Sequence, residues 1–231
     1  MSGKGVEPWV SGCWRRDFIR FADGTVDRET VVYWVQSGRY CGDIRAPASR
    51  PDFAAAQASL SQCHMTGDSA VWERELAFHP KRHFPEPGLL SLNGDVMTER
   101  APSGAYVEAW RRQPGSDGLR AAYALEGPRA GRLVVAGEHL YLAIDRPKPL
   151  AGDQTLQEML AAGADPKSLF DCEFSYARRE GEAFVIQAST IPAREGRPMA
   201  GLDGVSFQDE TFAQRGEGME RVWRRLYDGR D

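Results

Sequence analysis

Apolar and aromatic residues occur along the chain in short runs, and clusters of Gly, Pro, Asp and Ser separate these runs. Such runs are typical of β-strands joined by turns. The pattern predicts strands over residues 12–21, 29–36, 40–46, 69–78, 88–92, 95–100, 105–112, 119–125, 131–136, 139–146, 170–178, 183–190, 204–208 and 218–227. Short and evenly spaced strands of this kind indicate an all-β fold built from barrels or sandwiches.

Two stretches have a helical pattern instead. The first covers residues 53–60, where several alanines follow Asp52, a residue type that caps helix N-termini. The second covers residues 154–162, where three apolar residues follow i, i+3, i+4 spacing. We therefore expect one short helix in each half of the chain.

The two halves of the chain contain similar strings in the same order. WVQSGRYCGDIRAP at 34–47 aligns with VVAGEHLYLAIDRP at 134–147, an offset of 100 residues. The tripeptide Trp-Arg-Arg begins at Trp14, Trp110 and Trp223. Collinear matches of this kind are the mark of an internal repeat.

The repeat predicts two copies of one structural unit, over residues 9–113 and 117–231, joined by residues 113–118. An antiparallel sheet of six to eight strands removes its exposed edges by closing into a barrel. The sequence therefore predicts two tandem antiparallel barrels, and a barrel of about eight strands can enclose side chains or one small ligand.

The strings WRRDFIRFADGTVD, DIRAPASRP and STIPAREG resemble those of a group of uncharacterised bacterial proteins. That group is similar to the fungal Hri proteins, which have two consecutive lipocalin-like barrels. The resemblance covers nearly the whole chain and implies a fold of two lipocalin-like barrels. It implies no established activity and no catalytic residues.

Polar residues share strand faces with three tryptophans, because alternate residues of a strand point to the same side. The sets are Trp34 with Gln36, Trp72 with Arg74, and Tyr106 with Glu108 and Trp110. If the tryptophans point inward, we expect a buried ion pair between Arg74 and Glu108. This group predicts either a ligand-binding pocket with aromatic walls or a fully packed polar cluster in the first barrel.

Two further arginines, Arg45 and Arg50, lie close to the predicted mouth of the first barrel. Together they could bind a carboxylate or a phosphate with bidentate geometry. The alternative is structural, because Asp43 shares a strand face with Arg45 and could form an ion pair that fixes the following loop.

Composition narrows the class of partner. A formal net charge of −4 lacks the positive field that nucleic-acid binding usually needs. The longest apolar run, Val31–Val35, is far shorter than a membrane span, and the N-terminal MSGKGVEPWV lacks the apolar core of a secretory signal. The four cysteines have no CxxC spacing, so we expect buried thiols in the reducing cytoplasm.

Motifs of catalysis and cofactor binding are missing from the sequence. No GxSxG, Walker A or GxGxxG string occurs. His79 and His83 have i, i+4 spacing, but Pro80 opposes the helix that would bring both rings together. We therefore expect neither a cofactor nor a metal site, and we assign no catalytic residue.

These patterns favour a cytoplasmic protein that binds a small apolar or amphipathic molecule inside its first barrel. Fold analogy contributes much of this preference. A non-catalytic scaffold that binds a protein partner is the alternative. A barrel-housed isomerase, cyclase or haem-binding enzyme is the second alternative.

Overall fold

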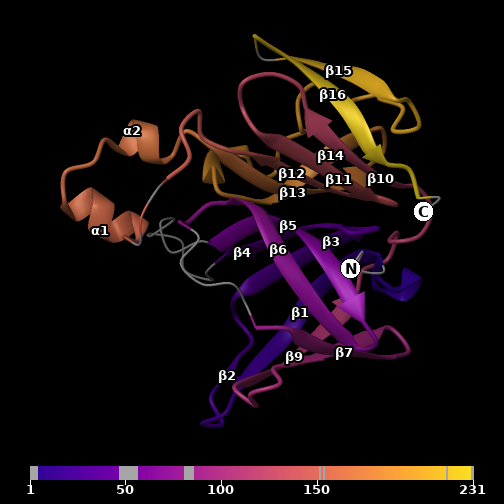
Figure 1. Ribbon diagram of the computed structural model, residues 1–231. Helices are drawn as coiled ribbons and strands as arrows, with labels where there is room; N and C mark the ends of the chain where they lie inside the picture. The colour runs from indigo at the N-terminus through magenta and orange to yellow at the C-terminus, as the bar shows by residue number, and fades with distance from the viewer. Residues whose placement is uncertain are drawn as a thin grey trace.

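Each half of the chain forms one antiparallel β-sheet, and the two sheets lie against each other (Figure 1). The computed structural model describes residues 5–46, 57–80, 86–150, 152, 154–216 and 218–229. No strand pairing among these residues joins the first half to the second. The expected all-β architecture with two barrel-like units is therefore confirmed.

The first sheet is a closed barrel. Its strands are β1 (Gly12–Phe21), β2 (Val26–Asp27), β3 (Val31–Ser37), β4 (Tyr40–Ala46), β5 (Gln57–Thr66), β6 (Ser69–Ala77), β7 (Gly88–Asn93), β8 (Val96–Arg100) and β9 (Tyr106–Arg112). From β3 to β9 each strand pairs with the next along the chain, and β9 then pairs with β1. The short β2 adds to the outer end of β1. Closure leaves eight strands around one interior, with every long strand paired on both sides.

The second sheet is curled but open within the described residues. Its strands are β10 (Arg120–Leu125), β11 (Gly131–Ala136), β12 (His139–Ile144), β13 (Glu173–Glu180), β14 (Ala183–Ser189), β15 (Thr211–Gly216) and β16 (Met219–Tyr227). Its edges are β14 and β15. Met199, Leu202 and Phe207, from the connection between these edges, are buried against the sheet interior. This connection fills the space that another strand pair would occupy.

Among the described residues, the two α-helices lie in the second half. Helix α1 (Leu156–Ala161) confirms the helix expected over 154–162, and Thr155 caps it together with Glu158. Helix α2 (Pro166–Leu169) follows it, and single 3-10 turns form at Pro8–Val10 and Pro192–Arg194. Leu156, Met159 and Leu169 pack into the core between the two sheets, and neither helix belongs to the first half.

Two sequence predictions of elements are wrong. Residues 57–60 of the helix expected over 53–60 belong to β5, and the rest of that stretch lies outside the described residues. Ala58 and Leu60 are buried on one face of β5 and Cys63 and Met65 on the other, so its apolar residues do not keep to one face. The strand expected over 204–208 is a series of turns, and the edge strand β15 begins at Thr211 instead.

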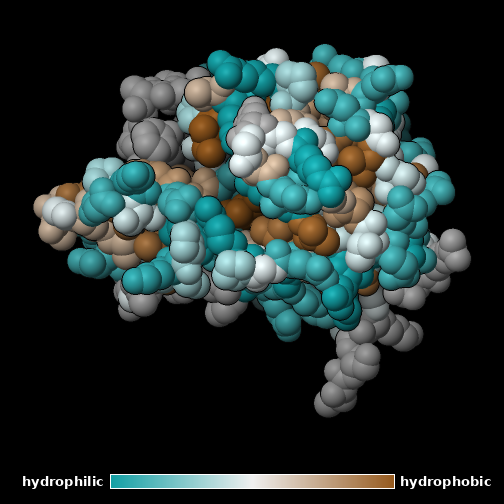
Figure 2. All heavy atoms as spheres, turned by 90° about the horizontal axis from the view of Figure 1, so that it is seen from above, coloured by the Kyte–Doolittle hydropathy of each residue, from teal (hydrophilic) through white to brown (hydrophobic). Residues whose placement is uncertain are grey.

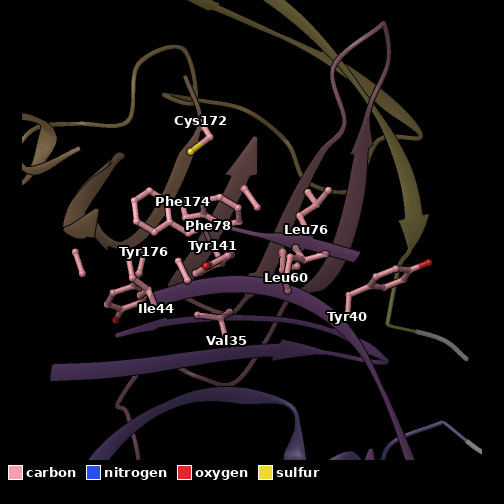
Figure 3. Close-up of a cluster of buried hydrophobic side chains, with 14 of the residues drawn as sticks. Val35, Tyr40, Ile44, Leu60, Leu76, Phe78, Tyr141, Cys172, Phe174 and Tyr176 are labelled. Carbon is pink, nitrogen blue, oxygen red and sulfur yellow. The ribbon is translucent and has the colours of Figure 1, made fainter. Parts of the chain in front are cut away.

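Buried side chains form three separate clusters. One lies inside the first barrel around Trp14, Trp34 and Trp110. Another fills the second sheet around Tyr123 and Trp223. The third lies between the two sheets and contains side chains of both halves (Figure 3). The two halves therefore share a hydrophobic interface.

Specific contacts fix this interface. Tyr141 lies so close to the β4 backbone that a Cβ on Gly42 would come within 2.0 Å of its ring, and its hydroxyl donates to the Asp43 carbonyl at 2.8 Å. Arg146, buried in the second half, donates to the Phe78 carbonyl at 2.7 Å. This packing therefore requires glycine at position 42, because even the Cβ of alanine would overlap the Tyr141 ring.

The connection between the two sheets lies between Arg112, where β9 ends, and Arg120, where β10 begins. It is not uniformly exposed, because Ser116 is buried and its hydroxyl accepts a hydrogen bond from the Cys13 amide at 3.0 Å. This hydrogen bond ties the connection to the first strand of the barrel.

The outer surface of the second half is mostly hydrophilic in the view from above, with hydrophobic side chains in a few small patches (Figure 2). Exposed Val222 and Leu226 lie on β16. No helix among the described residues is long and apolar enough to cross a membrane.

Candidate functional site in the first barrel

A cavity of about 270 Å³ opens inside the first barrel. Seven of the nine residues that the sequence predicted for a ligand site line it: Trp34, Arg45, Trp72, Arg74, Tyr106, Glu108 and Trp110. The barrel therefore brings together residues that are up to 76 positions apart in the sequence, from Trp34 to Trp110. The alternation of strand faces had placed these residues on one side.

The remaining two predicted residues are Gln36 and Arg50, and neither is among the residues that line the cavity. Gln36 is fully buried beside it, where its Oε1 accepts from Trp34 Nε1 at 2.8 Å. Its amide nitrogen donates to the Gly38 carbonyl at 2.6 Å, so Gln36 holds the Trp34 ring in place. Arg50 lies outside the described residues.

Three tryptophan rings form the aromatic wall. Trp34 contacts Trp72 and Trp110 edge to face, with ring centroids 5.8 and 5.6 Å apart. Such contacts stabilise aromatic pairs beyond the area they bury. The rings therefore support one another as a rigid wall.

The prediction of an ion pair between Arg74 and Glu108 is wrong. Glu108 pairs with Arg16 instead, whose Nη1 lies 2.9 Å from Glu108 Oε1, and both side chains are at most 4% exposed. Arg16 also contacts Asp27 at 2.9 Å. Arg16 follows Trp14 by two positions on β1, so the parity rule applied to that strand would have found it.

At the rim of the cavity, Arg45 contacts Asp43 at 3.0 Å, as the structural alternative for this pair required. Its Nη1 also lies 4.0 Å from Glu108 Oε1. Coulombic attraction to Asp43, and secondarily to Glu108, raises the pKa of Arg45 against the effect of burial, so Arg45 stays charged. Burial lowers the pKa of Arg74, against the attraction of Asp43.

Glu99 is a carboxyl group of the cavity wall that the sequence analysis did not name. Its carboxyl accepts a hydrogen bond from the Tyr106 hydroxyl at 3.0 Å, and it lies directly across from Glu108 in the pairing of β8 with β9. Burial, and then repulsion from Glu108, raises the pKa of Glu99 to about 8. Glu99 is therefore protonated at neutral pH. In the sequence, Glu99 could have been found from its position two residues after Met97, an apolar residue that shares its strand face.

Histidines and cysteines form no comparable site. His64 lies 3.7 Å from the exposed Glu73, and His83 is outside the described residues. Within the described ranges, no group of three or more His, Cys, Asp or Glu side chains is placed to hold a metal ion. All four cysteines are free and buried.

Comparison with known proteins shows the fold. No protein-family model and no curated protein matches the chain. Among solved structures, the crystal structure of the uncharacterised protein YLR301w from Saccharomyces cerevisiae is similar, with a TM-score of 0.62 and 9% sequence identity. The match covers 94% of this chain and 98% of the yeast chain. It supports the barrel relation that the resemblance implied, whereas membership of the bacterial group stays a prediction.

Proposed function

We propose that the protein binds a small amphipathic molecule in the cavity of its first, lipocalin-like barrel. The observation that carries this proposal is the composition of the cavity wall. Trp34, Trp72 and Trp110 offer apolar ring surface, and Glu99 and Tyr106 offer polar atoms beside it. Asp43, Arg45, Arg74 and Glu108 also line the cavity, so its wall is more polar than that of a usual small-molecule pocket. An amphipathic molecule suits such a wall better than a purely apolar one.

The volume limits the size of the ligand. At about 270 Å³, the cavity lies just below the range of roughly 300–1,000 Å³ that is usual for ligand pockets. A small molecule fits this space better than a long lipid chain.

In this proposal the second half supports the first barrel and does not bind the ligand. We take residues 9–113 as the binding unit and 117–231 as a second unit that packs on its outer face through the shared core. Four free, buried cysteines agree with the reducing cytoplasm as the setting of this function.

Native mass spectrometry of protein purified from its own host tests the proposal. We expect a species heavier than the 25.6 kDa chain by the mass of one small molecule, and we expect the added mass to disappear on denaturation. A native mass equal to that of the denatured chain would contradict the proposal and favour a scaffold with a purely structural interior.

A further inference from the structure

One carboxyl group in the cavity forms no ion pair with any residue that the structure describes. Glu108 pairs with Arg16 at 2.9 Å, and Asp43 pairs with Arg45 at 3.0 Å. Glu99, only 6% exposed, accepts a hydrogen bond from Tyr106, and no Lys, Arg or His of the described chain lies at ion-pair distance from it. A buried carboxylate without a partner is costly, so the group stays neutral unless a cation arrives.

The tryptophan wall reaches this same carboxyl. A Cβ built on Gly88 would lie 2.7 Å from the Trp72 ring and 2.9 Å from the Glu99 side chain, so both border the same small space. Trp34 contacts Trp72 edge to face on the other side. Aromatic faces attract cations, and tryptophan does so most strongly.

We propose that the ligand carries a cationic nitrogen, a quaternary ammonium or a protonated amine, that is seated between the tryptophan rings and the ionised Glu99. This inference rests on the proposed function and adds the chemical class of the ligand. At Glu99 the cation takes the place that Arg16 has at Glu108 and Arg45 has at Asp43.

Proton balance gives the proposal a pH dependence. Because the pKa of Glu99 is raised to about 8, the empty site holds a proton at neutral pH, and a bound cation displaces it into solvent. The groups that act on Glu99 are Glu108 and Tyr106 from β9, Arg45 and Asp43 from β4, and Cys63 from β5. Affinity for a cation should therefore rise as the pH rises from 6 to 8, by up to about tenfold per unit.

Choline and its uncharged isostere 3,3-dimethyl-1-butanol are the matched probes, because they differ mainly in charge. We expect calorimetric titration at pH 8 to show at least tenfold tighter binding of choline. At pH 6 this preference should shrink. Glu99→Gln, which mimics the protonated acid, should abolish the preference at both pH values, whereas the exposed Glu220→Gln should keep it.

Equal affinity for the two probes would overturn the cationic ligand and leave the cavity proposal intact. If choline does not bind but the neutral N-phenyl-1-naphthylamine binds in the cavity, the cationic ligand is likewise overturned and the cavity proposal stays intact. If none of the three compounds binds, both proposals fail. A choline preference that survives Glu99→Gln would overturn the role of Glu99.

Discussion

At the scale of single residues, the cavity depends on polar groups that satisfy one another. Glu108 is 2% exposed and holds the buried Arg16 guanidinium. Removing one partner of a buried ion pair leaves the other charge uncompensated, which typically costs about 3–5 kcal/mol. Glu108→Gln should therefore lower the free energy of unfolding, measured in urea, by several kcal/mol.

The matched control for this change is Glu220→Gln on β16. Glu220 pairs with Arg215 at 2.8 Å, but both side chains are more than half exposed. Exposed pairs of this kind contribute about 0–1 kcal/mol. Equal destabilisation by the two substitutions would show that the Arg16–Glu108 pair is not buried as described.

At the scale of elements, most strands and the closed order of the first sheet could be predicted from the sequence, whereas the register of the paired strands could not. Short apolar runs between turn residues gave β1, β4 and β11 with their observed bounds. The strand β5 escaped because Ala58 and Leu60 face the second half while Cys63 faces the barrel interior. The apolar residues therefore change from even to odd positions within β5, and this change interrupts the period of two that predicts a strand.

Irregularities in the strands explain why only part of the site could be predicted. A β-bulge between Arg16 and Phe18 in β1, and another where β6 passes Leu60 and Ser61, shift the parity along each strand. Parity placed Trp72 and Arg74 correctly because both precede the bulge in β6. Which arginine pairs with Glu108 depends on the β1–β9 register, and that register is a long-range property.

At the scale of the whole molecule, a hydrogen-bond chain links the two halves. His139 Nε2 lies 3.0 Å from the Pro114 carbonyl, and Nδ1 lies 2.9 Å from the Tyr176 hydroxyl. The Tyr176 hydroxyl lies 3.7 Å from the Cys13 sulfur of β1. The carbonyl can only accept, so His139 Nε2 carries a proton, and in the neutral ring Nδ1 then accepts from the Tyr176 hydroxyl.

Burial lowers the pKa of His139 to about 4, from an unfolded value of about 6.5. A lowered folded pKa at a histidine means that its contribution to stability is complete above about pH 6.5 and is lost as the pH falls toward 4. Over this interval the wild type should lose roughly 3 kcal/mol relative to His139→Gln.

Urea unfolding of both proteins between pH 7 and pH 4 measures this difference. The comparison with the variant is needed because Glu99, whose pKa is raised, loses its contribution as the pH rises from about 4.5 to 8 and so opposes the trend of the wild type. Parallel stability curves for the two proteins would show that His139 titrates normally in the folded state.

The central claim is that the first barrel holds a ligand in its tryptophan-lined cavity. Ser59 lines that cavity, and Ser59→Phe would place a bulky ring in the space for the ligand, whereas Ser91→Phe adds the same ring at an exposed position of β7. The measurement is quenching of tryptophan fluorescence by N-phenyl-1-naphthylamine, with circular dichroism to confirm that each variant folds. We predict saturable quenching in the wild type and in Ser91→Phe and none in Ser59→Phe. Unchanged quenching in a folded Ser59→Phe variant would contradict binding in the cavity.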